Sequence, residues 1–242
     1  MIFLIIVNYK YKIIYYFKKI IYYYIMNKII SFCLYGNKDL YCLGLIENIN
    51  IINQKYNNWK IYIYYNNIPE EIFNIIKNKD NTYLFECVHN GYNWEGMFWR
   101  FYPLESNDVD IFISRDADSR ITDREMNLVN KWIESNKSFH IIRDHEGHYI
   151  EILGGTFGVN IKLFNNLIKN FKEIDFYKEK YYLLYNKNID KQPDQIFLQE
   201  IIYPIIKNDN LTHISLESLR FSENDILIPS SSNFIGKPVF II

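Results

Sequence analysis

The sequence is poor in cysteine and lacks the arrangements in which cysteine builds structure. Its 242 residues contain 3 cysteines, Cys33, Cys42 and Cys87, and no two of them form a Cys-x-x-Cys pair. An odd number of isolated cysteines argues against a disulfide scaffold and against a structural zinc site. The same pattern fits a protein of a reducing compartment, so we expect a cytoplasmic location.

Three further absences narrow the possible functions. The formal net charge is −1, so no excess of basic residues supports binding to nucleic acid or to an anionic membrane. Neither a glycine-rich dinucleotide fingerprint nor a phosphate-loop lysine motif occurs, which disfavours NAD-dependent and P-loop enzymes. Residues 1–26 are apolar and aromatic, but Lys10, Lys12, Lys18 and Lys19 interrupt them. They therefore lack the apolar span of about 20 residues that a transmembrane helix needs.

The same N-terminal stretch also lacks the small-residue cleavage site of a signal peptide. We interpret residues 1–26 as an extension outside the fold, with Met26 as the natural start. A second interpretation is a basic, aromatic segment that touches a membrane surface. Residues 27–242 suit a single domain, and a hydrophobic content of 49% with 23% charged residues allows a sizeable core.

Apolar runs of strand length alternate with segments of helical periodicity along the rest of the chain. We expect strands at residues 29–36, 59–65, 82–88, 109–113, 138–142 and 149–153. We expect helices at residues 41–54, 69–76, 91–101, 122–133, 160–171 and 193–204, and a solvated helix or loop at 172–191. Such alternation predicts an α/β fold with a mostly parallel sheet between two layers of helices.

The stretch Asp108–Arg120 carries the strongest functional signal. It reads Asp-Val-Asp-Ile-Phe-Ile-Ser-Arg-Asp-Ala-Asp-Ser-Arg, an apolar run that stops at a polar segment. Side chains two residues apart in an extended segment point the same way, so Asp116 and Asp118 should converge and Arg115 should point away. Two converging carboxylates repel each other unless a cation lies between them, and Mg²⁺ and Mn²⁺ prefer such oxygen ligands. The alternative is a solvated turn at the strand end, in which the aspartates pair with Arg115 and Arg120.

The triplet Asp116-Ala117-Asp118 resembles the DxD motif of GT-A glycosyltransferases. Its context, Phe98-Trp99-Arg100-Phe101, then Arg115 to Arg120, then Arg124-Glu125, resembles a group of poorly characterised DxD glycosyltransferase-like proteins over residues 29–238. The resemblance implies a GT-A-like three-layer α/β/α sandwich in one domain. It also implies that Asp116 and Asp118 hold Mn²⁺ or Mg²⁺ on the diphosphate of a nucleotide sugar.

The resemblance extends to other positions. It implies His213 as a further metal ligand and Asp194 as a carboxylate that meets the acceptor, where it would serve as general base in an inverting enzyme. It places Tyr35, Gly36, Gly154, Gly155 and Lys237 against the donor. We also expect Arg100, whose guanidinium could pair with a phosphate bidentately, and Arg115 to bind the donor.

Each of these positions also has a structural explanation. Arg100 could form a salt bridge with Glu95 or Asp110 instead of binding phosphate, and Asp194 could be a helix N-cap. His213 could be a buried hydrogen-bonding residue. His145 and His148 are three residues apart, but no further Cys or His nearby completes a zinc site. We expect the loop that carries these two histidines to lie in the donor or acceptor pocket, with simple surface polarity as the alternative.

Metal-dependent transfer of a sugar, with a UDP-sugar as the leading donor, is the function that these patterns favour. Two alternatives are a different metal-dependent enzyme, either a nucleotidyltransferase or a phosphohydrolase, and a non-catalytic module that binds a nucleotide or glycan. We expect the partners to be a nucleotide-sugar donor and a glycan, protein or small-molecule acceptor, without nucleic acid or a stable membrane span.

Overall fold

The computed structural model describes residues 26–88, 94–168, 192–220 and 222–240. The expectations for residues 1–25 and 172–191 lie outside these ranges. The strands are β1 (Lys28–Tyr35), β2 (Lys60–Asn66), β3 (Thr82–Glu86), β4 (Ile111–Arg115), β5 (Phe139–Arg143), β6 (Thr156–Asn160), β7 (Asn210–Ser215) and β8 (Ile226–Ile228). The helices are α2 (Asp39–Lys55), α3 (Glu70–Ile76), α4 (Gly96–Trp99), α5 (Asp123–Ser135), α6 (Ile161–Ile168), α8 (Pro193–Phe197) and α9 (Tyr203–Ile206).

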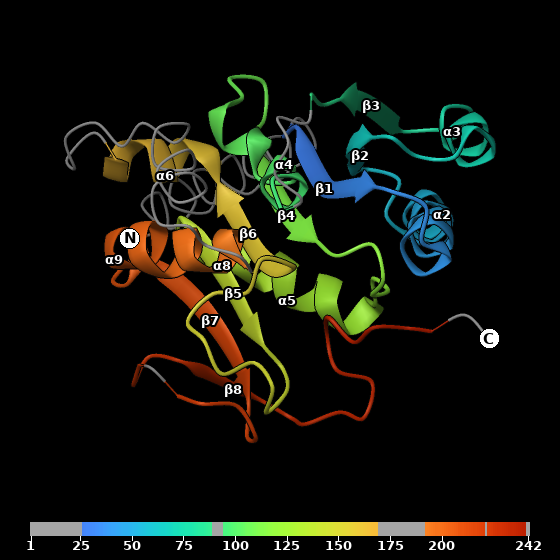
Figure 1. The fold of residues 1–242 in the computed structure, drawn as a ribbon. Coiled ribbons are helices and arrows are strands. Elements are labelled where there is room, and N and C mark those ends of the chain that lie inside the picture. The colour runs from blue at the N-terminus through green and yellow to red at the C-terminus, as the bar shows by residue number, and fades with distance from the viewer. Residues whose placement is uncertain (1–25, 89–93, 169–191, 221, 241–242) are drawn as a thin grey trace, which may run out of the picture.

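The strands form one sheet of eight in the order β3-β2-β1-β4-β6-β5-β7-β8 (Figure 1). Every neighbouring pair is parallel except those of β6, which runs antiparallel to both β4 and β5. The predicted mostly parallel sheet is therefore confirmed. Since β1 and β4 are parallel neighbours, their carboxyl ends meet at one edge of the sheet, where open α/β sheets bind ligands.

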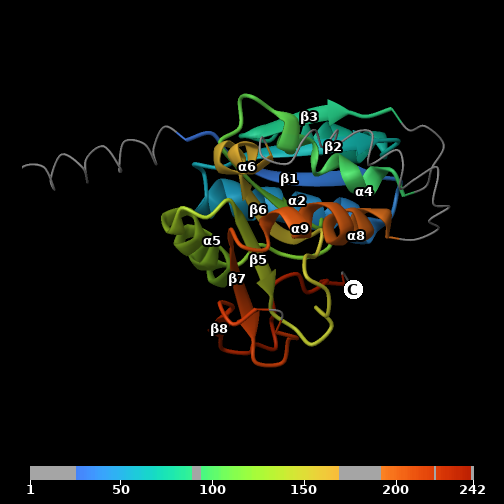
Figure 2. The same ribbon diagram turned by 90° about the vertical axis from the view of Figure 1, so that its left-hand side faces the viewer.

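Successive side chains of the central strands point to opposite faces of the sheet and pack into two separate hydrophobic cores. Ile29 of β1 and Phe112 of β4 pack with α4, α6, α8 and α9, whereas Ile30 and Ile113 pack with α2, α3 and α5 on the opposite face. Figures 1 and 2 show these two helical layers with the sheet between them. The three-layer sandwich predicted from the sequence is confirmed.

The helix α5 begins as its sequence predicts. The Thr122 hydroxyl accepts a hydrogen bond from the Glu125 amide at 3.2 Å, which satisfies one of the free amides of the first turn. Only half of a capping box forms, because the Glu125 carboxylate is buried in an ion pair with Arg115. The helix thus begins directly beyond the Asp116-Ala117-Asp118 loop and holds β4 through that pair.

Three local expectations are wrong. Residues 149–153 form no strand, because only Ile152 is fully buried while Tyr149 is largely exposed, so nothing fixes this segment in the sheet. The predicted helix over 91–101 is limited to α4 among the described residues. The predicted helix from Pro193 does not end at Pro204. A π-helical segment, Leu198–Ile202, precedes α9, so the proline occupies the first turn of α9, where an amide hydrogen is not needed.

Within the described ranges, every helix is too short or too polar to cross a bilayer.

Candidate active site

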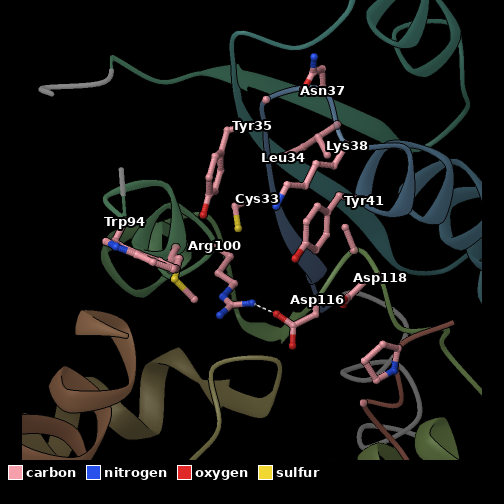
Figure 3. Close-up of a pocket in the computed structure, with 15 residues that line it drawn as sticks. Cys33, Leu34, Tyr35, Asn37, Lys38, Tyr41, Trp94, Arg100, Asp116 and Asp118 are labelled. Carbon is pink, nitrogen blue, oxygen red and sulfur yellow. Dashed lines mark hydrogen bonds and ion pairs between the residues drawn. The ribbon is translucent and has the colours of Figure 1, made fainter. Parts of the chain in front are cut away.

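A cavity of about 570 Å³ opens where β1 and β4 end (Figure 3). One wall comes from the end of β1 and the loop after it, residues 33–38, together with Tyr41. Trp94, Met97 and Arg100 line the opposite wall. The loop 116–118 lies between these walls, and Gly236 and Pro238 of the C-terminal segment also line the cavity.

The backbone of the Asp116–Asp118 loop is fixed from beneath by α2. The fully buried Asn48 amide donates to the Ser119 carbonyl at 2.7 Å and accepts from the Ile121 amide at 3.1 Å. Gly44 lets α2 approach, because a Cβ at this position would lie 2.3 Å from the Ala117 carbonyl oxygen. A buried amide with both of its groups satisfied orders a loop strongly, so the two aspartates are held in position before any ligand binds.

The guanidinium of Arg100 connects the loop to helix α8. This buried side chain pairs with Asp116 through Nη1 and with Asp194 Oδ2 through Nη2, the latter at 2.9 Å (Figure 3 shows the first pair). The two alternatives considered from sequence, Glu95 and Asp110, are therefore wrong as its partners. Neither of the real partners is near Arg100 in sequence, since Asp194 lies 94 residues away.

Gly154 and Gly155 allow this charged cluster to form. A Cβ at Gly155 would lie 1.8 Å from Asp116 Oδ2, and one at Gly154 would lie 2.5 Å from Arg100 Nη2. The Gly154 amide also donates to Gln195 Oε1 at 3.3 Å, which draws the start of α8 toward the cluster. The glycine pair thus lies against the Arg100 and Asp116 side chains, a contact that its sequence pattern does not reveal.

Three carboxylates lie around one guanidinium at the loop 116–118, and Lys38 lines the same cavity. Asp116, Asp118 and Asp194 surround the single guanidinium of Arg100. Burial, and then the charge of Asp116, raises the pKa of Asp118 to about 6, and burial also raises the pKa of Asp194. A carboxylate whose charged form is disfavoured in this way gains most from a nearby cation.

The donor set at the loop fits Mg²⁺ or Mn²⁺ in an open site. Among the described residues, no group of three or more His, Cys, Asp or Glu side chains is gathered closely enough to hold a metal ion. Mg²⁺ commonly binds through one or two carboxylates together with substrate phosphates and water, and Asp116 and Asp118 supply the two carboxylates. The arrangement does not resemble a closed zinc site in which every ligand comes from the protein.

Three residues expected in the site lie elsewhere. Arg115, the last residue of β4, has a buried side chain that pairs with Glu125 and donates to the Phe157 carbonyl at 2.9 Å. It therefore does not face the cavity. His213 is also buried, with its Nδ1 2.9 Å from Nε2 of His140, so it does not join Asp116 and Asp118. The Lys237 ammonium donates to the Ser232 carbonyl at 2.9 Å and is not part of the cavity wall.

These placements follow from strand geometry. Alternation along β4 points Arg115 away from the cavity and into the protein, where it needs an anion. His213 lies in the middle of β7, which β4 does not neighbour. The simple turn with Asp116 and Asp118 bound by Arg115 and Arg120 is also wrong, because Arg120 pairs with Glu47.

Other residues of the site were not identified from the sequence. Tyr41 extends from α2 toward Asp116 in Figure 3, and the burial of its hydroxyl, together with the charge of Asp118, raises its pKa. Gln195 donates to Asp194 Oδ2 at 3.1 Å. Gln195 could have been proposed from the sequence, because it directly follows Asp194. Tyr41 gave no such signal, because it belongs to an ordinary helical pattern in a sequence that contains 22 tyrosines. Tyr35 and Gly36 do line the cavity, at the place where they were expected.

Comparison with solved structures finds the same fold in a known glycosyltransferase, at low sequence identity. The glycosyltransferase GlyE of Streptococcus pneumoniae TIGR4 aligns with 77% of this chain and 45% of its own, with a TM-score of 0.50 and 17% identity. The galactosyltransferase LgtC, solved with donor and acceptor sugar analogues, aligns over 78% of this chain and 76% of its own, with a TM-score of 0.48 and 12% identity. A 4-diphosphocytidyl-2C-methyl-D-erythritol synthase from Anaerococcus prevotii aligns over 88% and 92%, with a TM-score of 0.45 and 10% identity.

No protein-family description and no curated protein matches the sequence. The chain spans less than half the length of GlyE. At these identities the likeness concerns the fold, which is the GT-A-like α/β fold that the sequence predicted.

Proposed function

We propose that this protein is a metal-dependent glycosyltransferase that moves a sugar from a nucleoside diphosphate, with UDP as the leading candidate, to an acceptor. The observation that carries the proposal is the pair Asp116 and Asp118, which lines a cavity at the carboxyl end of β4 and is linked through Arg100 to Asp194. The fold is consistent with it, since it is the one found in GlyE.

The residues in and around the cavity would have different roles under this proposal. Asp116 and Asp118 would hold Mn²⁺ or Mg²⁺, which when bound would offset the negative charge of the diphosphate and of the leaving group. Tyr35 and Gly36 would contact the nucleoside, since they form the wall next to the end of β1. The backbone approach at Gly154 and Gly155 would keep Arg100 and Asp116 beside the donor sugar.

The burial of Asp194 favours a positioning role over that of a general base. Its side chain is 0% exposed, and Oδ2 already accepts from Arg100 and from Gln195. A base must reach the acceptor hydroxyl, directly or through one water, and a fully covered carboxylate does not offer this. We propose that Asp194 orients Arg100, and Asp194→Asn should then weaken donor binding as well as turnover.

Calorimetric titration of UDP and GDP, with and without Mn²⁺, tests the proposal most directly. We expect one nucleotide to bind only with the metal, and Asp118→Ala to lose that binding because one of two carboxylate ligands is removed. Asp123→Ala is a suitable control, since this nearby aspartate is exposed and pairs with Lys55 outside the cavity. Failure of both nucleotides to bind under any metal condition would contradict the proposal.

Product analysis separates sugar transfer from the other metal-dependent reactions that two carboxylates can support. Release of the free nucleoside diphosphate together with a glycoside or free sugar supports transfer. Release of pyrophosphate or phosphate from a nucleotide substrate would instead identify a nucleotidyltransferase or a phosphohydrolase.

Metal affinity should depend on pH near the pKa of Asp118. Because that pKa is raised to about 6, protons compete with the metal for Asp118 below this value. We expect the affinity for Mn²⁺ to be level above about pH 7 and to fall roughly tenfold per pH unit below about pH 6. Electron paramagnetic resonance of free Mn²⁺ would measure it, and Asp118→Asn should have a weaker affinity that is flat across the same range. A wild-type affinity that stays level from about pH 7 down to about pH 5 would show that Asp118 is not a ligand.

A further inference from the structure

Two histidines in the loop after β5 have their ring protons placed by the backbone. The Asp144 amide donates to Nδ1 of His148 at 3.0 Å, and the Gly147 amide donates to Nδ1 of His145 at 3.0 Å. A backbone amide can only donate, so each Nδ1 must be the bare nitrogen of its ring. The proton of the neutral imidazole therefore sits on Nε2 in both residues.

This tautomer decides what the two rings can bind. A histidine ligates a metal through a bare ring nitrogen, and the outer nitrogen, Nε2, is protonated here. The spacing of His145 and His148, which suggested a metal site, therefore does not provide one in this arrangement. What each ring offers at Nε2 is an N–H donor, whose natural partner is an oxygen with negative charge.

Of the two rings, His148 is the one next to the cavity. Its ring lies beside Gly236, a residue of the cavity wall, and a Cβ at Gly236 would be 3.9 Å from Nε2 of His148 and 2.9 Å from Cγ2 of Thr156. Asp116 is close enough that its charge acts on the His148 imidazole. Among the described residues, Nε2 of His148 has no hydrogen-bond partner, and the side chain is half-buried.

The imidazole is also neutral at the pH at which the proposed reaction would run. Burial, and then the neighbouring His145, lowers the pKa of His148 to about 4, while Asp144 and Asp116 oppose this and Arg143 adds to it. The ring thus keeps one proton, on Nε2, and does not bring a positive charge to compete with a metal at Asp116.

The surroundings hold this ring in place. Asp144 accepts from Arg124 at 2.7 and 3.1 Å and from the Ile235 amide at 3.0 Å, which ties the loop to the C-terminal segment. The ring of Phe234 stacks on His145 with centroids 4.0 Å apart and planes at 24°. A donor that is fixed in this way can contribute to binding without a large loss of side-chain entropy.

We propose that His148 binds the diphosphate of the donor by donating its Nε2–H to a phosphate oxygen, on the Gly236 side of the cavity. This inference rests on the proposed function, because it names a contact to the donor of that reaction. It adds a neutral donor to the two carboxylates, and it assigns His148 a role in anion binding.

Titration of UDP and GDP into the full chain with saturating Mg²⁺ tests it, with whichever nucleotide binds the wild type as the probe. We expect His148→Ala to weaken this binding roughly 10- to 100-fold, the range for a hydrogen bond to a charged group. His148→Gln, which places an amide N–H near the same position, should recover part of it. The matching nucleoside, which has no phosphate, should bind all variants equally in ligand-observed NMR. Tyr149→Ala is the control, since this neighbouring side chain is largely exposed.

The outcomes separate the two proposals. If the wild type binds neither nucleotide, the proposed function itself fails. If the wild type binds and His148→Ala binds equally well, only the role of His148 fails. A tenfold loss of Mn²⁺ affinity in His148→Ala without nucleotide would make His148 a metal ligand and overturn the inference. Nitrogen-15 spectra of the histidine rings give an independent test, because His148 must show the Nε2-protonated form with and without Mg²⁺.

Discussion

Replacing Arg100 by methionine should lower the free energy of unfolding by about 3–5 kcal/mol, the usual cost of leaving one member of a buried ion pair alone. The variant keeps the length of the apolar stem but leaves Asp194, which is 0% exposed, without its cation. Urea denaturation followed by far-ultraviolet circular dichroism would measure the change. Nucleotide binding should also be lost, because Asp116 loses the same partner.

The double variant Arg100→Met, Asp194→Asn provides the matched control. It removes the uncompensated charge, so we expect it to regain much of the stability that Arg100→Met loses. The single variant should also become more stable relative to the double variant as pH falls. Burial raises the pKa of Asp194 in the folded protein, and loss of Arg100 raises it further, so the folded state binds the proton more tightly than the unfolded state. Equal stabilities of the two variants at all pH values would show that the pair is not buried in solution.

Gly155→Ala should reduce metal-dependent nucleotide binding roughly 100-fold, as expected when a metal ligand is displaced. The new Cβ would lie 1.8 Å from Asp116 Oδ2, so this carboxylate must leave its position. Stability should change little, because the Asp116 side chain is 41% exposed and can swing toward solvent. Calorimetry of UDP with Mn²⁺ and thermal unfolding would measure both effects.

Gly158→Ala serves as the comparison for Gly155→Ala, because it adds the same methyl group nearby in the chain but in the core. Its Cβ would lie 2.9 Å from the Trp132 ring and 3.0 Å from Cγ2 of Ile113, both in the core. We expect a loss of about 1–3 kcal/mol in stability with nucleotide affinity retained, since overpacking affects the fold and not the site. If Gly155→Ala instead destabilised the protein and kept its affinity, the contact with Asp116 would have no role in binding.

Much of the fold was predictable because it rests on local patterns. The apolar run of Ile29 to Tyr35, the helical periodicity of α2 and the start of α5 at Thr122 each depend on a few neighbouring residues, and the structure shows a strand or helix at each. The antiparallel strand β6 was not predictable in this way. Its partners β4 and β5 are chosen by packing across the sheet, and a short segment that contains Gly158 gives no direction.

The residues of the candidate site show the same difference between what local sequence predicts and what depends on tertiary packing. Asp116 and Asp118 could be found because both lie in one short loop after a recognisable strand. The partners of Arg100 could not be found, since the pairing with Asp194 depends on where α8 packs. Arg115 and His213 were misplaced for a related reason. A charged or titratable side chain in a strand can be satisfied by a buried partner, here Glu125 or His140, that only the tertiary structure brings near.

The contact between the aspartate loop and the C-terminal segment has a consequence for the order of folding. Ser119 forms an antiparallel bridge with Pro238, and the Val239 amide donates to the Asp118 carbonyl at 2.8 Å. Contacts so distant in sequence form late, because the long segment between the two partners must be closed into a loop first. During synthesis, the aspartate loop would therefore emerge and pack on α2 long before its outer wall is available. We expect the nascent protein to acquire its sheet first and its capacity to bind ligand last.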